Sequence, residues 1–145
     1  MTWPLALRFA HLVAVLTWVG GMLFIALVLV PVTRRLDDAA LRVRLVQDSG
    51  RRFRTVGWIA LAVIVATGLG NLLFRPELLG APRFWLKAAL VTLALILAAV
   101  HDFVLGPRAG RPGAPASARV RAAWIARVNM LVALAIVALG LALRG

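Results

Sequence analysis

The sequence predicts an all-α fold, an integral membrane antiparallel four-helix bundle that forms one domain over residues 1–145. Hydrophobic residues make up 63% of the chain, whereas an ordinary soluble domain is about 45–50% apolar. They form four continuous runs, and each run reaches the roughly 20 residues that cross a bilayer. Short connections between such runs favour antiparallel neighbours. The helices are expected at about residues 5–31, 54–74, 83–105 and 119–143.

The first run follows Trp3 and Pro4, an aromatic residue typical of membrane interfaces and a proline typical of helix starts. The run is longer than the 7–15 apolar residues of a signal peptide, and no A-x-A cleavage site follows it. We therefore expect a retained helix. Its only potential charges are Arg8 and His11.

Two connectors between the runs are basic. Residues 32–53 join the first run to the second, and residues 106–118 join the third to the fourth. In the first, Leu36, Ala40 and Val43 recur at helical spacing, which predicts that part of it is an amphipathic helix on the membrane surface. The second is rich in Gly, Pro, Ala and Arg, and this composition is typical of a flexible loop.

Basic residues indicate the orientation in the membrane. Twelve of the 17 lysine and arginine residues lie in the two connectors and the adjoining helix ends. The positive-inside rule then places both termini outside a bacterial-type inner (plasma) membrane. We attribute the net charge of +12 to this topology and to contact with anionic headgroups, rather than to nucleic-acid binding.

Small and polar residues form a stripe on two of the helices, and such stripes let neighbouring helices approach closely. A bundle this small could also form a homodimer through them. The stripes consist of Gly57, Ile64, Gly68 and Asn71 on the second helix, and of Asn129, Ala133, Ile136 and Gly140 on the fourth.

The stretch His11–Gly21, HLVAVLTWVGG, places an imidazole inside an apolar run. Burying an unpaired polar group costs roughly 2–7 kcal/mol, and ionisable residues in membrane helices are functional candidates by default. The simpler alternative is a hydrogen bond from His11 to a backbone carbonyl of another helix. Trp18 and Met22 share its face.

The third helix carries Lys87 and His101 on one face. At about 1.5 Å per residue, Lys87 matches the depth of His11 in the outer half, whereas His101 lies about 18 Å deeper. The two histidines therefore cannot ligate one ion and are poorly placed as the two axial ligands of one haem. Lys87 and His11 should face one cavity, with His11 neutral because two neighbouring cations would repel.

Two candidate sites follow, and no catalytic residue is assigned. The outer, cofactor-binding site comprises His11, Lys87, Asn71 and Trp18. Candidate metal ligands are His11 in the outer site and His101, Asp102 and Met22 in an inner one. The alternatives stay open: Lys87 could reach to the headgroups, His101 and Asp102 could be an interfacial pair, and Met22 could only pack. Cysteine is absent, so thiolate sites and iron–sulfur clusters are excluded.

The stretch His11–Gly21 resembles the first helix of the CopD family of copper-resistance and copper-export membrane proteins. The segments FWLK (Phe84–Lys87), HDFVLGP (His101–Pro107) and TGLG (Thr67–Gly70) are similar to later helices of that family. The pattern also resembles the HemJ-type protoporphyrinogen oxidase, in which a first-helix histidine and a third-helix lysine are functional. Those residues correspond to His11 and Lys87, although the tyrosines that follow the HemJ motif are missing.

The resemblance implies a small membrane protein that binds or transports copper, and we favour this role over catalysis. The alternatives are a haem-b-binding redox protein or HemJ-like oxidase, with His11 as axial ligand and Lys87 near the propionates, and a non-catalytic assembly subunit. A methionine-rich or histidine-rich run that would indicate copper independently is absent.

The charge distribution generates a prediction about topology. Alkaline phosphatase, which is active only outside the cytoplasm, should be active when fused after Gly145, whereas green fluorescent protein at the same point should stay dark. The opposite pair of readings would contradict the orientation inferred from the arginines.

Overall fold

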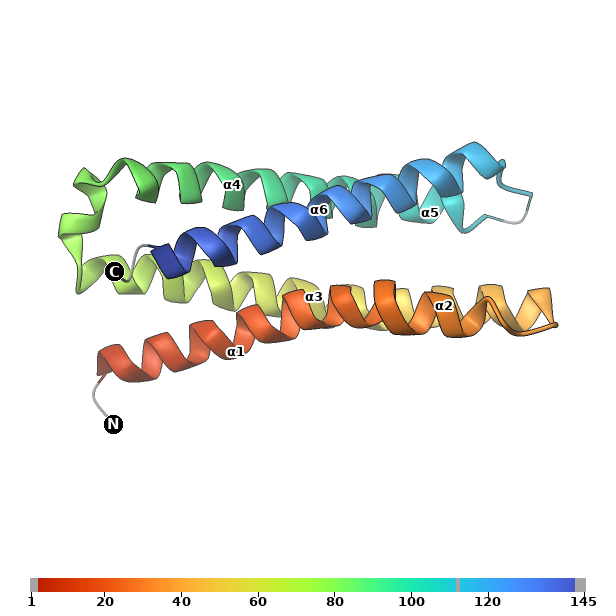
Figure 1. Cartoon of the computed structure of the whole chain (residues 1–145), viewed down its shortest axis with the longest axis horizontal. Helices are drawn as coiled ribbons and strands as arrows, with labels where there is room; N and C mark the ends of the chain where they lie inside the picture. The colour runs from red at the N-terminus through yellow and green to blue at the C-terminus, as the bar shows by residue number, and fades with distance from the viewer. Residues whose placement is uncertain (1–2, 112, 143–145) are drawn as a thin grey trace. The chain divides into compact units, whose positions relative to one another are not determined.

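The computed structural model describes residues 3–111 and 113–142, and the chain divides into two compact units, Met1–Pro76 and Glu77–Gly145. Each unit is a hairpin of two long helices (Figure 1). In chain order the elements are α1 (Trp3–Phe24), the π-helix η1 (Ile25–Leu29), α2 (Val30–Thr33), α3 (Ala39–Leu73), the 3-10 helix η2 (Pro76–Gly80), α4 (Pro82–Ala99), the π-helix η3 (Val100–Leu105), α5 (Gly106–Ala109) and α6 (Ala116–Ala142).

In the first unit, α1, η1 and α2 form one uninterrupted helix that packs along α3. A five-residue turn, Arg34–Asp38, reverses the chain. Asp38 then caps α3, because its carboxylate accepts hydrogen bonds from the backbone N–H groups of Ala40 (2.8 Å) and Leu41 (3.0 Å). Only after this cap does the chain become helical again, so the cap fixes where α3 begins.

In the second unit, α4, η3 and α5 form the corresponding continuous helix, which packs along α6. Pro82 occupies the first turn of α4, where its missing N–H costs nothing. The Trp85 indole donates a hydrogen bond to the Leu79 carbonyl at 2.9 Å, which ties this first turn to η2. The start of the long helix is thus fixed by one proline and one side-chain hydrogen bond.

The first long helix of each unit contains a π-helical turn just before a proline. Proline has no N–H and clashes with the carbonyl four residues earlier, so an α-helix cannot pass through it unchanged. Here the hydrogen bonds widen to five residues, from the N–H of Val30 to Ile25 and from that of Gly106 to His101. A Cβ atom at Gly106 would lie 3.0 Å from the His101 carbonyl oxygen, so this close approach suits glycine.

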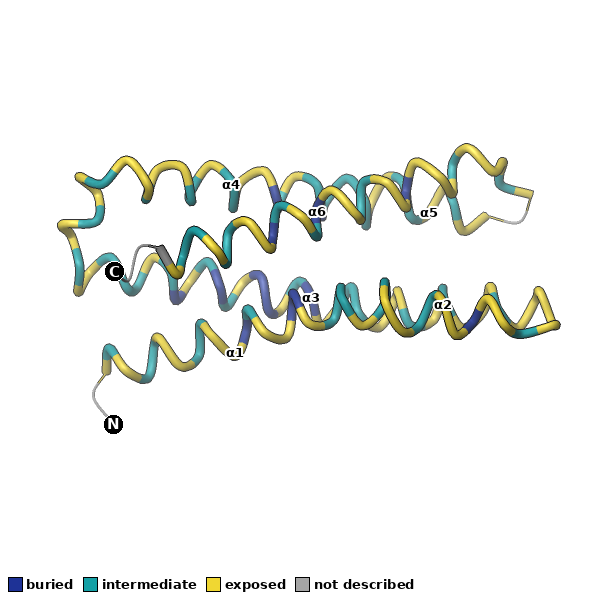
Figure 2. The backbone as a smooth tube through the Cα atoms, viewed as in Figure 1, coloured by how far each residue is buried: buried dark blue, intermediate teal, exposed yellow. Residues whose placement is uncertain are grey.

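Four helical segments are long and apolar enough to cross a membrane: Trp3–Thr33, Ala39–Leu73, Pro82–Ala109 and Ala116–Leu141. About half of their large apolar residues are exposed, and Figure 2 colours such positions yellow. Leu16, for example, is 71% exposed. In water such a surface would aggregate, whereas lipid tails match it.

The predicted all-α class is confirmed, and each unit is the antiparallel helix pair that a four-helix bundle requires. The prediction of one domain over residues 1–145 stays a prediction. The connectors are shorter than predicted: α3 begins at Ala39 instead of near residue 54, and residues 106–109 of the second connector are helical. The arginines explain the first difference, because arginine favours a helix whether or not the segment is apolar.

Close packing of small residues holds α1 against α3. A Cβ atom at Gly57 would lie 3.6 Å from Trp18 Cδ1, so the buried indole rests on the α3 backbone. A Cβ atom at Gly21 would overlap the Phe53 ring. Dispersion contacts of this kind are the main attraction between helices in lipid, where the hydrophobic effect is lost.

This packing predicts that Gly21→Val destabilises the first unit by roughly 1–3 kcal/mol, because the Phe53 ring must leave its place. Gly20→Val is the matched control, since a Cβ atom there has nothing within 4 Å. Unfolding by increasing fractions of SDS in mixed micelles measures the difference. Phe53→Ala should suppress the effect of Gly21→Val, and equal destabilisation by the two glycine variants would contradict the packing argument.

Candidate functional site

His11 lies on α1 and contacts Thr67 of α3. Its ring nitrogen Nδ1 lies 2.8 Å from the Thr67 hydroxyl oxygen. Thr67 is buried, with 7% of its surface exposed, and His11 is half-buried. The imidazole therefore has a side-chain partner inside the hairpin, where the sequence analysis had considered only a backbone carbonyl as the alternative.

The hydrogen bonds of Thr67 determine which nitrogen of His11 carries the proton. The hydroxyl lies 2.5 Å from the carbonyl oxygen of Val63, one turn earlier on α3, and donates its single proton to it. Thr67 must then accept from His11, which places a proton on Nδ1. In the neutral ring the lone pair is therefore on Nε2, the nitrogen used in many metal sites.

The imidazole lies close to Gly68. A Cβ atom there would lie 3.8 Å from His11 Cε1, an ordinary van der Waals contact, so the ring packs against α3 at this level. Thr67 and Gly68 belong to the TGLG segment that the sequence analysis compared with known helices. Thr67 itself was not predicted as a partner of His11, and its position next to the glycine stripe was the one signal that could have indicated it.

Lys87 occupies a comparable position in the second unit. It is half-buried on α4, and its Nζ would lie 3.3 Å from a Cβ atom at Gly140 of α6. The Lys87 Nζ therefore lies against Gly140, which belongs to the stripe of small and polar residues on α6. This orientation differs from that of a lysine whose side chain runs along its own helix towards the headgroups.

His101 and Asp102 form a pair on the π-helix η3. Nδ1 of His101 lies 2.8 Å from Oδ1 of Asp102, and the side chains are 35% and 20% exposed. A carboxyl group hydrogen-bonded to one ring nitrogen orients an imidazole, which is how many metal-binding histidines are held. The pair is a second candidate site, at the end of the unit that carries the connector.

The other predicted site residues have less direct roles. Trp18 is buried against Gly57 and packs the two helices together. Asn71 and Met22 are half-buried. Met22 is eleven residues from His11 on the same helix, about 16 Å away, so the two cannot share an ion.

The structure places the predicted residues in two groups. The first unit holds His11, Trp18, Met22 and Asn71, and the second holds Lys87, His101 and Asp102. The pairings that join the units, His11 with Lys87 and Met22 with His101, stay predictions. Over residues 3–111 and 113–142, no three His, Cys, Asp or Glu side chains gather as they would around a metal ion.

Four membrane-length helices in two hairpins, with polar side chains turned towards the partner helix, define a multi-pass α-helical membrane protein. Residues 47–143 match the family described as Copper resistance protein D, CopD. The chain belongs to this family.

One relative aligns with nearly the whole chain. An uncharacterized protein of Aquifex aeolicus is 30% identical over 142 residues, which cover 94% of this chain and 92% of that protein. No solved structure matches the chain. The family match begins at Gln47 and so includes Thr67, Lys87 and the His101–Asp102 pair, whereas His11 precedes it.

The hydrogen bond to Thr67 predicts the tautomer of His11. In ¹⁵N-histidine-labelled protein carrying His101→Gln, which leaves His11 as the one histidine of the two, solid-state NMR should show protonated Nδ1 and unprotonated Nε2. Thr67→Val should convert this signal into a mixture of tautomers, because the acceptor is lost. Thr67→Ser should retain it, and an Nε2-protonated ring in the Thr67 protein would contradict the assignment.

Proposed function

We propose that this protein handles copper as a cargo ion within the membrane, with His11 supplying a nitrogen ligand. Family membership points to copper. The observation that carries the role of His11 is its hydrogen bond to Thr67, since a ring that donates through Nδ1 has the lone pair for a metal on Nε2. Imidazole is a suitable ligand for copper, and cysteine is absent from the chain.

The number of donors in each unit favours transit over storage. One histidine lies in each hairpin, and the described residues form no cluster of three metal-binding side chains. A site that passes an ion onward must bind it weakly enough to release it. One imidazole in each hairpin offers few metal donors, whereas three or four converging donors would retain copper.

The His101–Asp102 pair is the second copper-binding position in this proposal. It lies fourteen residues along the helix from Lys87, about 21 Å, and therefore near the other side of the membrane. In this proposal the positive-inside rule sets the orientation. Both termini lie outside a bacterial inner membrane, and the two basic connectors lie on its cytoplasmic side.

A haem b site is the second candidate, and the same hydrogen bond favours it. Axial histidines of haem also donate through Nδ1, so His11 would suit this role. In that case Lys87 would pair with the propionates. The two cofactors are distinguished by the absorption spectrum, because haem gives an intense Soret band and Cu(I) none.

The test is equilibrium dialysis of the purified protein against Cu(I) in the presence of a competing chelator. His11→Gln should weaken copper binding by more than about tenfold, as expected when a metal loses a ligand. Leu12→Ala, at the neighbouring lipid-exposed position, should bind as the unmodified protein does. Unchanged copper binding by His11→Gln would refute the role of His11, and a Soret band in the purified protein that this variant loses would favour haem.

A further inference from the structure

Contacts along the first hairpin fix which levels of α1 and α3 lie side by side. Each of these contacts joins a glycine to a side chain of the facing helix, so the distances leave little freedom in the alignment. From the terminal end to the connector end, the facing pairs are Leu7 with Gly70, His11 with Gly68, Trp18 with Gly57 and Gly21 with Phe53.

This alignment shows that the apolar parts of the two helices end at different levels. The apolar part of α3 begins after Arg54 and faces the segment of α1 up to about Gly21. Some 20 residues cross the hydrocarbon core, and residues 55–73 of α3 with the following Phe74 supply them. Residues 22–33, which are almost entirely apolar, therefore lie beside the arginine-rich start of α3 instead of beside its apolar part.

The length of this overrun is too great for an upright hairpin. Twelve further helical residues extend about 18 Å, whereas the headgroup layer of one leaflet is only about 5–8 Å thick. An upright hairpin would therefore hold Leu27 and Val32 in water. These side chains are 67% and 57% exposed.

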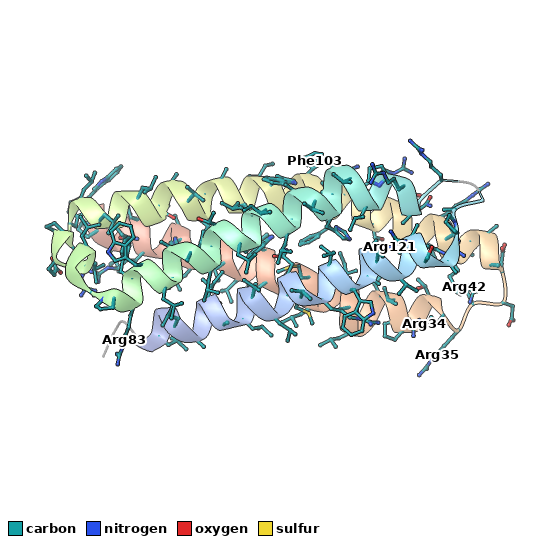
Figure 3. All side chains as sticks on the ribbon, turned by 90° about the horizontal axis from the view of Figure 1, so that it is seen from above. Arg34, Arg35, Arg42, Arg83, Phe103 and Arg121 are labelled. Atoms are coloured by element: carbon teal, nitrogen blue, oxygen red, sulfur yellow. The ribbon has the colours of Figure 1, made fainter. Side chains whose placement is uncertain are left out.

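The segment that faces these apolar residues is charged. It consists of the turn and the start of α3, and residues 34–52 contain six arginines and three aspartates. Asp38 is used in the cap of α3, and Asp48 pairs with Arg51. Figure 3 shows the labelled side chains of Arg34, Arg35 and Arg42 around the turn that joins α2 to α3. Arg44 and Arg52 are also exposed.

We propose that residues 22–53, the connector end of the first hairpin, lie in the headgroup layer of an anionic leaflet. Exposed apolar side chains of residues 24–32 enter the acyl region, and the arginines bind lipid phosphates. Two observations favour lipid over a protein partner. The exposed apolar surface continues without interruption from the membrane-spanning part of α1, where Leu16 is exposed, and the excess of arginine complements anionic phospholipid.

The π-turn has a place in this arrangement. It occupies Ile25–Leu29, directly after the level at which the apolar part of α3 ends, and Pro31 follows it. Prolines and π-turns are the points at which long helices change direction. The break in the regular α-helix therefore lies within the part of the first helix that extends past the apolar part of α3.

The absence of cysteine allows a direct test by site-directed spin labelling. Single variants Leu27→Cys and Val32→Cys report on the proposed contact. Leu16→Cys is the control in the membrane span, and Asp37→Cys is the control in the turn. The full chain is placed in vesicles of phosphatidylcholine, alone or mixed with phosphatidylglycerol. Collision rates with oxygen, which partitions into lipid, and with a water-soluble nickel chelate are measured by power saturation.

With phosphatidylglycerol present, labels at Leu27 and Val32 should show oxygen-to-nickel collision ratios severalfold above that at Asp37, approaching that at Leu16. Ratios equal to that at Asp37 would mean that the end projects into water. Protection from both reagents would mean that protein, such as a second copy, covers it. Either result overturns the proposal.

The contribution of the arginines is tested with Val32→Cys as the reporter. Arg44→Gln/Arg52→Gln should lower the ratio at Val32 in phosphatidylglycerol vesicles severalfold, towards its value in phosphatidylcholine alone. Arg119→Gln/Arg121→Gln removes the same charge from the start of α6 and should leave the reporter unchanged. If the ratio at Val32 changes neither with phosphatidylglycerol nor with the Arg44/Arg52 substitutions, charge has no role. Leu16→Cys combined with the same arginine substitutions should keep its ratio, which shows that each variant is still inserted.

Discussion

The alignment of α1 with α3 is the constraint on which the first unit depends. The Phe53 ring occupies the space that a Cβ atom at Gly21 would fill, and Trp18 lies in van der Waals contact with Gly57, so these contacts favour the observed register. A shift by one helical turn is about 5.4 Å, which would separate His11 from Thr67, now 2.8 Å apart. The same register sets the arginines of α3 beside the apolar end of α1. Packing by small residues thus positions both the candidate site and the membrane boundary.

The two histidines differ in how their surroundings treat charge. His11 donates to a hydroxyl that is itself bound to a helix carbonyl, so its partner is neutral. His101 instead has a carboxyl oxygen of Asp102 2.8 Å from its Nδ1. The two imidazoles are thus oriented by different groups, a threonine hydroxyl on the facing helix and an acidic side chain next to it in the chain.

Much of the fold was predictable because lipid leaves the backbone few choices. Apolar runs of membrane length must be helical. The stripes containing Gly57 and Asn129 were predicted from spacing, and their residues are buried or half-buried. The partner of His11 was harder to predict. A threonine in an apolar helix can bond to its own helix carbonyl, as Thr67 does to Val63, so the sequence gives no sign that it also accepts a bond from elsewhere. A helix in part of the first connector was predicted from spacing, and residues 39–53 are helical. That this helix continues into the second membrane span was not predicted, because spans are recognised by apolarity and the first sixteen residues of α3 are arginine-rich.

The π-turns reveal a correspondence between the two units. His11 lies twenty residues before Pro31, and Lys87 lies twenty residues before Pro107, with a π-turn between each pair. Each of the two side chains rests on a glycine of the partner helix. One local plan is therefore present in both units: a polar side chain against a glycine of the partner helix, then a π-turn and a proline. The polar residue differs between the units, since it is a histidine in the first and a lysine in the second.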